Sequence, residues 1–295
     1  MREKGKSELL AYLLNAPTIA MLLFIGIFPL LYCSYFSFFD YRIITQSATF
    51  VGAGNYVSAF QDPVFLSSLK VTGTYVLVAL PLELTLGFIL ALILNQKTRG
   101  SSIIRVVFMI PLMVAPLVAG YLWRFMYWPD LGLVDTIINR FGIRTPEWVA
   151  NPQTALPSLI VVDVWQWTPF VFLILLAGLQ ALPKEPYEAA LIDGASRLQV
   201  FRYITLPMMK TIIAVAILFR FTDLIKIFDQ PLIITNGGPG FSTYTASLYI
   251  YRVGLSEQFR VGYAAALSWI LNIITMVAVM IFIRRTFVSE EKRPA

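Results

Sequence analysis

The sequence predicts an all-α protein that crosses a membrane six times. Hydrophobic residues make up 58% of the 295 positions and charged residues 14%, whereas soluble domains have roughly 45–50% and 25%. Six stretches reach the about 20 apolar residues that a helix needs to cross a bilayer. These stretches are residues 14–38, 70–94, 106–128, 155–178, 211–233 and 263–283. The loops leave no room for a separate soluble domain, so residues 1–295 are expected to form a single transmembrane domain.

The distribution of positive charge predicts the orientation of these spans. With the N-terminus in the cytoplasm, fourteen Lys and Arg residues fall on the cytoplasmic side and seven outside. Cytoplasmic loops of membrane proteins carry such an excess. We therefore expect both termini and the loop 179–210 in the cytoplasm. The net charge of +6 then reflects contact with the lipid bilayer, and no nucleic-acid partner is needed to explain it.

The first apolar stretch is expected to be retained as a span. It follows a basic leader, but it is too long for a signal-peptide core and no small-residue cleavage site follows it. Cys33 is the only cysteine and lies within this span, and histidine is absent from the sequence. A disulfide framework is therefore excluded, and the commonest general base and metal ligand are both missing. We expect no catalytic residue and no metal site.

The fourth span carries polar and aromatic residues near its outer end: Asp163, Trp165, Gln166 and Trp167. Aromatic rings flanked by amides and carboxylates suit sugar rings, which have a polar rim and an apolar face. Tryptophans also gather at the membrane interface, and this interpretation is favoured for Trp165 and Trp167. Both interpretations stay open at this point.

The loop 179–210 is a polar island between two apolar spans, and its local signals predict two short helices joined by a bend. Gly194 suits a helix end, because it adopts positive φ without a Cβ penalty. Ser196 and Gln199 form a capping box that opens the second helix, and Pro207 is expected to end that helix. Such a loop on the cytoplasmic side indicates a docking site for a partner.

The fifth span carries four charged residues at every third position: Arg220, Asp223, Lys226 and Asp229. A charged side chain near the bilayer centre costs about 2.5–3.5 kcal/mol, so this stripe must face the protein interior or a water-filled path. On a continuous helix its neighbours pair at i,i+3. One hypothesis is a structural ladder of ion pairs to a neighbouring helix, with Asp163 or Glu83 as partner. The other is a direct role in lining a solute path.

The sixth span places Trp269 and Asn272 three residues apart on one face. Because an amide inside the membrane needs a polar partner, Asn272 is a further candidate for the path. The complete set of candidate path residues is Asp163, Trp165, Gln166, Asp223, Lys226, Asp229, Gln230 and Asn272.

The loop 179–210 resembles the EAA loop of permease subunits of binding-protein-dependent ATP-binding-cassette (ABC) importers. That family pattern is Glu-Ala-Ala, three residues, Gly, nine residues, Ile, one residue and Leu-Pro. It is matched without gap or substitution by Glu188, Ala189, Ala190, Gly194, Ile204, Leu206 and Pro207. A fixed spacing over this distance is a specific signal, unlike a lone tripeptide.

Other segments are similar to the carbohydrate-uptake branch of that family, which includes maltose, glycerol-phosphate and trehalose permeases. They are Phe28-Pro29-Leu30, Trp165-Gln166-Trp167-Thr168-Pro169-Phe170 and Thr235-Asn236-Gly237-Gly238-Pro239-Gly240. One departure is Ala53-Gly54, where this group more often has Leu followed by an acidic or polar residue.

The resemblance implies the type I ABC importer permease fold in the cytoplasmic or inner membrane of a bacterium or archaeon. The chain would form half of the translocation path for a sugar or sugar-like solute, meaning an oligosaccharide, glycoside, polyol or glycerol phosphate. A periplasmic or lipid-anchored binding protein would deliver that solute. Further implied partners are a second homologous permease subunit and two copies of an ATPase subunit.

The resemblance also implies that catalysis takes place elsewhere. ATP and Mg would be bound by the partner ATPase, so this chain would be neither an enzyme nor the holder of a cofactor. The short cytoplasmic helices would dock on the ATPase and carry its motion into the spans. The implied coupling residues are Glu188, Ala189, Ala190, Asp193, Gly194, Leu206 and Pro207.

Two other classes of function compete with this one. A membrane-embedded enzyme could use the carboxylates inside the spans, but the sequence has no histidine, no paired carboxylates on one helix face and no metal-ligand spacing. An ion-coupled secondary transporter could move protons or sodium along the charged fifth span. We find no inverted repeat that pairs two interrupted spans, and the EAA-like loop would then have no role. The sequence does not identify the solute.

Overall fold

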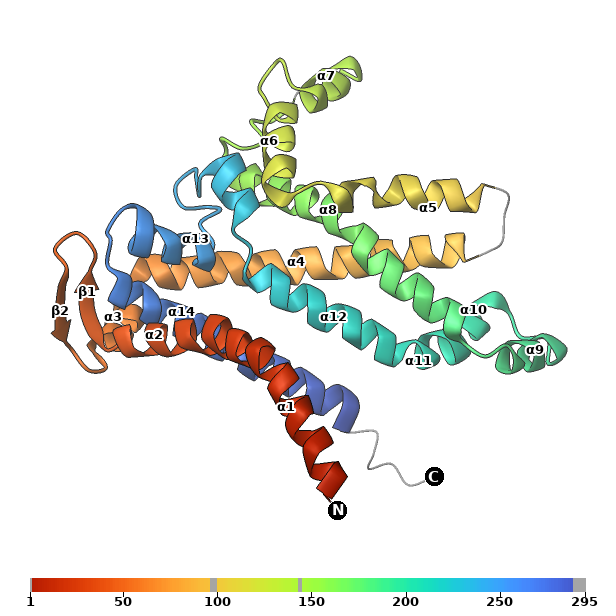
Figure 1. Ribbon diagram of the computed structural model, residues 1–295. Coiled ribbons are helices and arrows are strands. Elements are labelled where there is room, and N and C mark those ends of the chain that lie inside the picture. The colour runs from red at the N-terminus through yellow and green to blue at the C-terminus, as the bar shows by residue number, and fades with distance from the viewer. Residues whose placement is uncertain (1, 96–99, 143–144, 289–295) are drawn as a thin grey trace. The chain divides into compact units, whose positions relative to one another are not determined.

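The computed structural model describes residues 2–95, 100–142 and 145–288 (Figure 1). The expected cytoplasmic end of the chain, residues 289–295, lies outside this range. The chain forms two compact units. Unit 1 contains Met1–Pro63 and Ile250–Ile273, and unit 2 contains Val64–Tyr249 and Ile274–Ala295. Each unit is described by itself below.

Four unbroken helical segments are long and apolar enough to cross a membrane: Tyr12–Phe36, Pro63–Leu94, Pro152–Ala181 and Val261–Phe287. Two bent pairs of helices qualify when each pair is taken as one span. They are Ser101–Met113 with Pro116–Met126, and Arg197–Met208 with Lys210–Ile225. The described residues thus provide four to six spans. The prediction of an all-α membrane protein is confirmed, and the bent pairs occupy the expected third and fifth spans.

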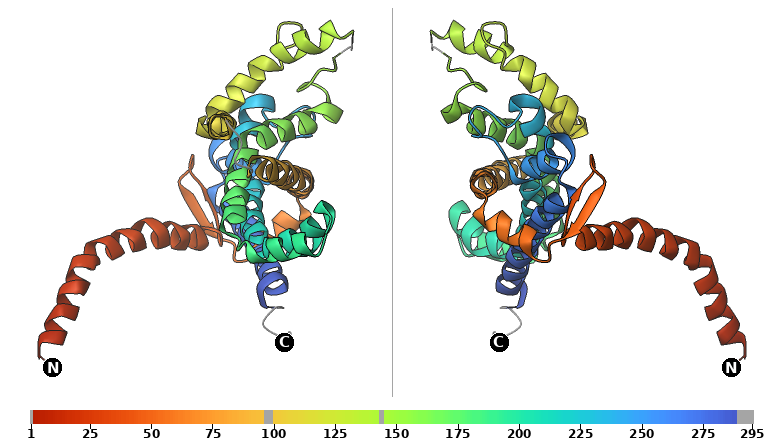
Figure 2. Two further views of the ribbon diagram at one scale, coloured as in Figure 1. Left: turned by 90° about the vertical axis from the view of Figure 1, so that its right-hand side faces the viewer. Right: turned by 90° about the vertical axis from the view of Figure 1, so that its left-hand side faces the viewer.

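Unit 1 begins with a long curved helix, which Figure 2 shows as a continuous rod. Helix α1 (Arg2–Leu22) runs through a π-helical turn, Leu23–Ile27, into α2 (Phe28–Phe36). Strands β1 (Phe39–Arg42) and β2 (Ser47–Phe50) follow as an antiparallel hairpin, and then comes α3 (Gly54–Gln61). Asn55 of α3 ties these parts together, because its Nδ2 donates to the carbonyls of Ser37 and Phe39, at 2.9 Å each.

Unit 2 is built around three long helices and their connections. Its elements are α4 (Pro63–Leu94), α5 (Ser101–Met109), the 3₁₀ turn η2 (Ile110–Met113), α6 (Pro116–Met126), α7 (Leu133–Arg140), α8 (Pro152–Ala181), α9 (Glu185–Ile192), α10 (Arg197–Val200), the π turn η3 (Phe201–Thr205), α11 (Leu206–Met208), α12 (Lys210–Ile225) and the π turn η4 (Pro231–Thr235). Helices α13 (Ala246–Tyr251) and α14 (Val261–Ile283) have residues in both units, and a π turn at Arg284–Val288 follows α14.

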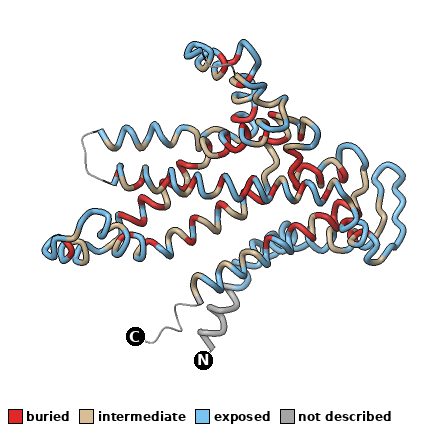
Figure 3. Tube along the Cα trace, turned by 180° about the vertical axis from the view of Figure 1, so that it is seen from behind, coloured by how far each residue is buried: buried red, intermediate tan, exposed pale blue. Residues whose placement is uncertain are grey.

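Helix α8 is the central helix of the unit 2 core. In an apolar stretch of 18 residues within α8, 61% of the residues are buried, whereas the corresponding share in α4 is 28%. None of the corresponding stretch of Tyr12–Phe36 is buried within the described chain (Figure 3). Buried side chains of α4 and α8, among them Ala91 and Phe172, form one apolar cluster with Met209, and the partly buried Ile212 and Ile213 of α12 pack against it. A Cβ at Gly178 would lie 2.7 Å from the Ile212 side chain. The missing side chain of Gly178 therefore allows α8 and α12 to approach closely.

The third expected span is broken. A bend of 95° separates Ser101–Met113 from Pro116–Met126, where the sequence predicted one span over 106–128. Val114 and Ala115 between them are extended, with ψ of 127° and 138°. Proline disfavours helical geometry in the residue before it, and Ala115 precedes Pro116. The break frees the Val114 carbonyl from a helical hydrogen bond.

The fifth expected span also ends early. Helix α12 stops at Ile225, whereas the sequence predicted a helix over 211–233. Pro231 has no N–H to bond with the carbonyl of Ile227 four residues back, and its ring would clash with that carbonyl. The Thr245 hydroxyl donates to the Ile227 carbonyl instead, at 3.0 Å. Asp229 therefore does not lie on the helix of Arg220, and the expected continuous stripe of four charges is interrupted.

Candidate functional site

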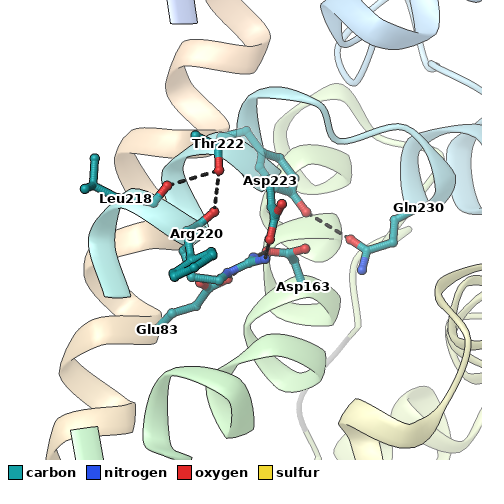
Figure 4. Close-up of polar contacts among 9 residues, drawn as sticks. Glu83, Asp163, Leu218, Arg220, Thr222, Asp223 and Gln230 are labelled. Carbon is teal, nitrogen blue, oxygen red and sulfur yellow. Dashed lines mark hydrogen bonds and ion pairs between the residues drawn. The ribbon is translucent and has the colours of Figure 1, made fainter. Parts of the chain in front are cut away.

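A buried ion cluster joins the three central helices of unit 2 (Figure 4). Arg220 of α12 donates from Nε to Glu83 Oε2 at 2.6 Å, and from Nη2 to Glu83 Oε1 at 2.8 Å. The same Nη2 donates to Asp163 Oδ2 at 2.9 Å. All three side chains are at most 1% exposed. Sequence reasoning left Glu83 and Asp163 as alternative partners of the fifth span, and the structure brings both to Arg220.

Two more side chains surround the Arg220 guanidinium. Asp223 Oδ2 lies 3.7 Å from Nη1, and this carboxylate is 54% exposed. The guanidinium carbon lies 4.7 Å from the centre of a Trp167 ring, in cation–π contact. Trp167 thus contacts a buried charge in addition to any role at the membrane interface. Trp165 instead packs edge-on against Trp123, with ring centres 5.5 Å apart.

A chain of amide hydrogen bonds lies beside the ion cluster. The Tyr75 hydroxyl donates to Gln230 Oε1 at 3.0 Å, and Gln230 Nε2 donates to Gln166 Oε1 at 3.0 Å. Gln166 Nε2 donates to the Val114 carbonyl at 2.9 Å. The chain links α4 to the segment after α12, then to α8 and to the break in the third span. The predicted residues Gln166 and Gln230 are thus bound to each other.

Sequence reasoning missed Tyr75 and treated Glu83 only as a possible partner. Glu83 had a detectable signal, since it is an acidic residue inside a long apolar helix. Tyr75 gave no signal, because a tyrosine is compatible with an apolar span.

A cavity of about 220 Å³ adjoins the ion cluster, at the point where α12 ends. This volume is below the roughly 300–1,000 Å³ of pockets for drug-sized ligands. It is lined by Pro116, Asp163, Trp167, Arg220, Asp223, Leu224, Lys226, Ile227, Phe228, Asp229 and Gln230. Five of the eight predicted path residues line it. Trp165 and Gln166 do not line it, and Asn272 is an exposed residue of unit 1.

The loop between α8 and α12 has the predicted bend. Gly194 adopts φ of +69° after α9, and its N–H donates to the Leu191 carbonyl at 3.2 Å. The Ala195 N–H donates to the Ala190 carbonyl at 2.9 Å, which completes a Schellman motif. The capping box of Ser196 and Gln199 is present at the start of α10. Helix α10 then continues through η3 into α11, so the helical path passes Pro207 and breaks at Met209 with a bend of 64°. The second helix therefore ends at Met208, one residue after the expected end at Pro207.

The bend exposes large apolar side chains: Leu191, Ile192, Leu198 and Tyr203. Ile192 is 86% exposed. Glu188, Ala189 and Asp193 are exposed beside them, whereas Ala190 is buried under the bend. The Tyr187 hydroxyl donates to Thr205 Oγ1 at 3.2 Å and fixes α9 to η3. The described loop therefore presents a preformed surface of apolar residues with charged neighbours.

Comparison with known proteins identifies the family. Residues 83–288 match the family described as "binding-protein-dependent transport system inner membrane component". The chain belongs to this family. It is therefore a non-catalytic membrane component of an ABC importer, a multi-pass protein of the inner membrane. The permeases of this family hold no cofactor of their own.

Individual relatives extend the match over almost the whole chain. A probable ABC transporter permease protein, y4oQ of Sinorhizobium fredii, is 37% identical over 269 residues, which cover 90% of this chain and 86% of the relative. The trehalose/maltose transport system permease protein MalF of Thermococcus litoralis is 34% identical over 279 residues, covering 95% and 92%.

A solved structure shows the same fold. A chain of a bacterial alginate ABC transporter, in complex with an alginate pentasaccharide-bound periplasmic protein, superposes with a TM-score of 0.83 and 22% identity. The superposition covers 97% of each chain.

Proposed function

We propose that this chain forms half of the translocation path for a sugar or sugar-like solute that an extracytoplasmic binding protein delivers. The candidate solutes are oligosaccharides, glycosides, polyols and glycerol phosphates. A second homologous permease would form the other half, and two copies of an ATPase subunit would bind ATP and Mg. Support for the sugar class comes from relatives whose names refer to trehalose and maltose.

The observation that carries this proposal is the cavity at the end of α12, which has charged and amide side chains among its lining residues. Its lining combines carboxylates, an amide and the aromatic ring of Trp167, which is the combination that binds sugar hydroxyls and their apolar ring faces. Charged side chains are expensive inside a membrane, so several of them around one cavity there indicate a functional site. In transporters, helix ends within the membrane commonly border the solute site.

Coupling to the ATPase is proposed to run through the cytoplasmic bend between α9 and α10. The exposed residues Leu191 and Ile192 would enter an apolar cleft of the ATPase, and Glu188 would make a charged contact at its rim. Because the Schellman motif and the capping box hold the bend rigid, movement of the ATPase would pass into α12 and α8 as a rigid-body displacement.

Transport by a reconstituted complex tests the proposal. The chain is purified with its second permease and its ATPase, placed in proteoliposomes, and supplied with the binding protein. The solutes are trehalose, maltose, an acidic disaccharide and glycerol 3-phosphate. We expect uptake of at least one solute that requires both ATP and the binding protein. Uptake driven by a proton or sodium gradient without ATP would instead support a secondary transporter.

A further inference from the structure

We propose that the cavity beside Arg220 accepts uncharged, hydroxyl-bearing solutes and rejects anionic ones. This inference rests on the proposed function and narrows the solute class at the same site. It removes glycerol phosphates and acidic sugars from the candidate solutes and keeps neutral sugars and polyols.

The charges around the cavity disfavour an anion. Three carboxyl groups line it, those of Asp163, Asp223 and Asp229, against the cations Arg220 and Lys226. Glu83 adds a fourth carboxyl group, which binds Arg220 from behind. In the lining itself carboxyl groups outnumber cations three to two, and Glu83 behind it offsets the charge of Arg220. Low-dielectric walls strengthen the repulsion of a like charge within such a site.

Arg220 is not available to bind an anion. A guanidinium binds carboxylate or phosphate best through two parallel N–H donors. The Nε and Nη2 of Arg220 already make this pair of bonds to Glu83, and Nη2 also binds Asp163. Asp223 lies at Nη1 and the Trp167 ring covers one face of the guanidinium. The strongest cation in the lining is thus neutralised by the protein itself.

The end of α12 adds a second repulsive element. Lys226 is the C-cap of α12 and belongs to the cavity lining. The C-terminal end of a helix carries a partial negative charge from its unbonded carbonyl groups. This partial negative charge reduces the positive potential that the Lys226 ammonium would present to a solute. The cavity wall formed by the helix end therefore does not favour anions either.

Asp163 supplies the feature that favours a hydroxyl group. Its Oδ2 binds Arg220, whereas its buried Oδ1 has no hydrogen-bond partner among the residues that the structure describes. Asp163 is fully buried and lines the cavity. Leaving a buried polar atom without a partner is costly. A solute hydroxyl both donates and accepts, so one that reaches this oxygen as the solute enters would satisfy it whether or not the carboxyl group holds a proton.

Matched sugars with and without a negative charge test the inference. The probes are trehalose and trehalose 6-phosphate, or maltose and maltose 6-phosphate, according to which neutral sugar the complex imports. Calorimetry measures binding to the whole complex in nanodiscs, without the binding protein, at low and at high salt. We expect the phosphate ester to bind about tenfold more weakly, or worse, at low salt. High salt should bring the affinities of the two sugars closer together, because it screens the electrostatic repulsion.

A variant with fewer carboxylates in the lining tests whether this difference in affinity arises in the cavity. Asp223→Asn combined with Asp229→Asn should strengthen binding of the phosphate ester relative to the neutral sugar and so reduce the ratio of the two affinities severalfold, even if both affinities change. Glu147→Gln is the matched control, since Glu147 is an exposed carboxylate of the same unit that does not line the cavity. It should leave the ratio unchanged.

Four results would overturn the inference. They are equal binding of the two sugars, a ratio unaffected by the double variant, no binding of the imported neutral sugar at millimolar concentration, and import of acidic solutes only. The proposed function survives each of them as long as ATP-driven uptake is observed. Absence of any ATP-driven, binding-protein-dependent uptake would instead contradict the proposed function.

Discussion

Arg220 and Glu83 lie 137 positions apart in the sequence and share two parallel hydrogen bonds, at 2.6 and 2.8 Å, inside the core of unit 2. This fork geometry fixes the rotation of α12 against α4. Asp163 binds the same guanidinium from α8, so one residue holds three helices in register. Burying a charge without a partner costs several kcal/mol. The cluster therefore makes correct packing of these helices depend on all three side chains.

Removal of Arg220 should prevent assembly. Arg220→Ala leaves Glu83 and Asp163 buried without their cation, which costs about 3–5 kcal/mol. We expect the yield of purified complex to fall severely and its melting temperature to drop. Size-exclusion chromatography and thermal unfolding measure both effects.

Asp229→Ala is the matched comparison for this variant. Asp229 lies beyond the end of α12 and is only half-buried, so its loss should spare assembly and weaken uptake. An equal loss of yield in both variants would indicate that these residues are purely structural. Normal uptake by Asp229→Ala would remove Asp229 from the path.

The bend at Gly194 should require a residue that tolerates positive φ. A Cβ at this glycine would meet no atom within 4 Å, so any cost comes from the backbone conformation. Gly194→Val should destabilise the bend by roughly 1–2 kcal/mol and lower the solute transported per ATP hydrolysed, whereas Gly194→Asn should come close to the wild type. Gly142→Val is the control, because Gly142 has φ of +72° and equally open space outside this loop. If Gly194→Val and wild type transport the same amount of solute per ATP hydrolysed, the bend does not transmit the motion of the ATPase.

The exposed apolar surface of the cytoplasmic bend should bind the ATPase. Ile192→Asp should weaken ATPase binding by about tenfold or more, because desolvating an unpaired carboxylate costs several kcal/mol. Co-purification of the ATPase with the chain, and its ATPase rate in the complex, measure the effect. Leu131→Asp is the control, since Leu131 is 83% exposed on a loop away from the bend. ATPase binding lost equally in both variants would point to a general folding defect.

Close packing of α8 on α12 should limit the size of residue 178. Gly178→Ala places a Cβ 2.7 Å from two atoms of Ile212, and such overpacking costs about 1–3 kcal/mol. A second change, Ile212→Ala, should recover part of the lost melting temperature. Gly73→Ala has no atom within 4 Å of the new Cβ, and it should be neutral or slightly stabilising. A stable Gly178→Ala variant would show that the helices can separate at no cost.

The bend between α9 and α10 was predicted from sequence because its determinants are local. The positive φ of Gly194 and the capping box of Ser196 and Gln199 depend on residues within one or two helical turns, so their spacing is visible in the chain. The end of the second helix was predicted at Pro207, one residue before its actual end at Met208. The same local geometry decides which apolar side chains the bend exposes.

The breaks in the third and fifth spans were less predictable. Hydropathy is continuous across the break in the third span, whereas Asp223, Lys226 and Asp229 surround the break in the fifth. In both spans a proline follows the place where the helix stops. Proline alone does not decide the outcome, since Pro157 and Pro169 lie inside the unbroken helix α8. Whether a break forms depends on a partner for the freed carbonyl. Gln166 serves Val114 and Thr245 serves Ile227, and both contacts span long distances in the sequence.

The sequence by itself determined that this protein is a membrane-spanning helical permease, that Arg220 of its fifth span lies inside the protein, and that a bend at Gly194 separates two short helices. Those properties follow from hydropathy, charge and short-range turn chemistry, which act over a few residues. Only the tertiary structure decided that Glu83 and Asp163 both bind Arg220, that Tyr75 joins the amide chain, and that Asn272 belongs to the other unit. Such pairings are set by how three helices pack, because side chains from distant segments meet only after the helix axes are fixed.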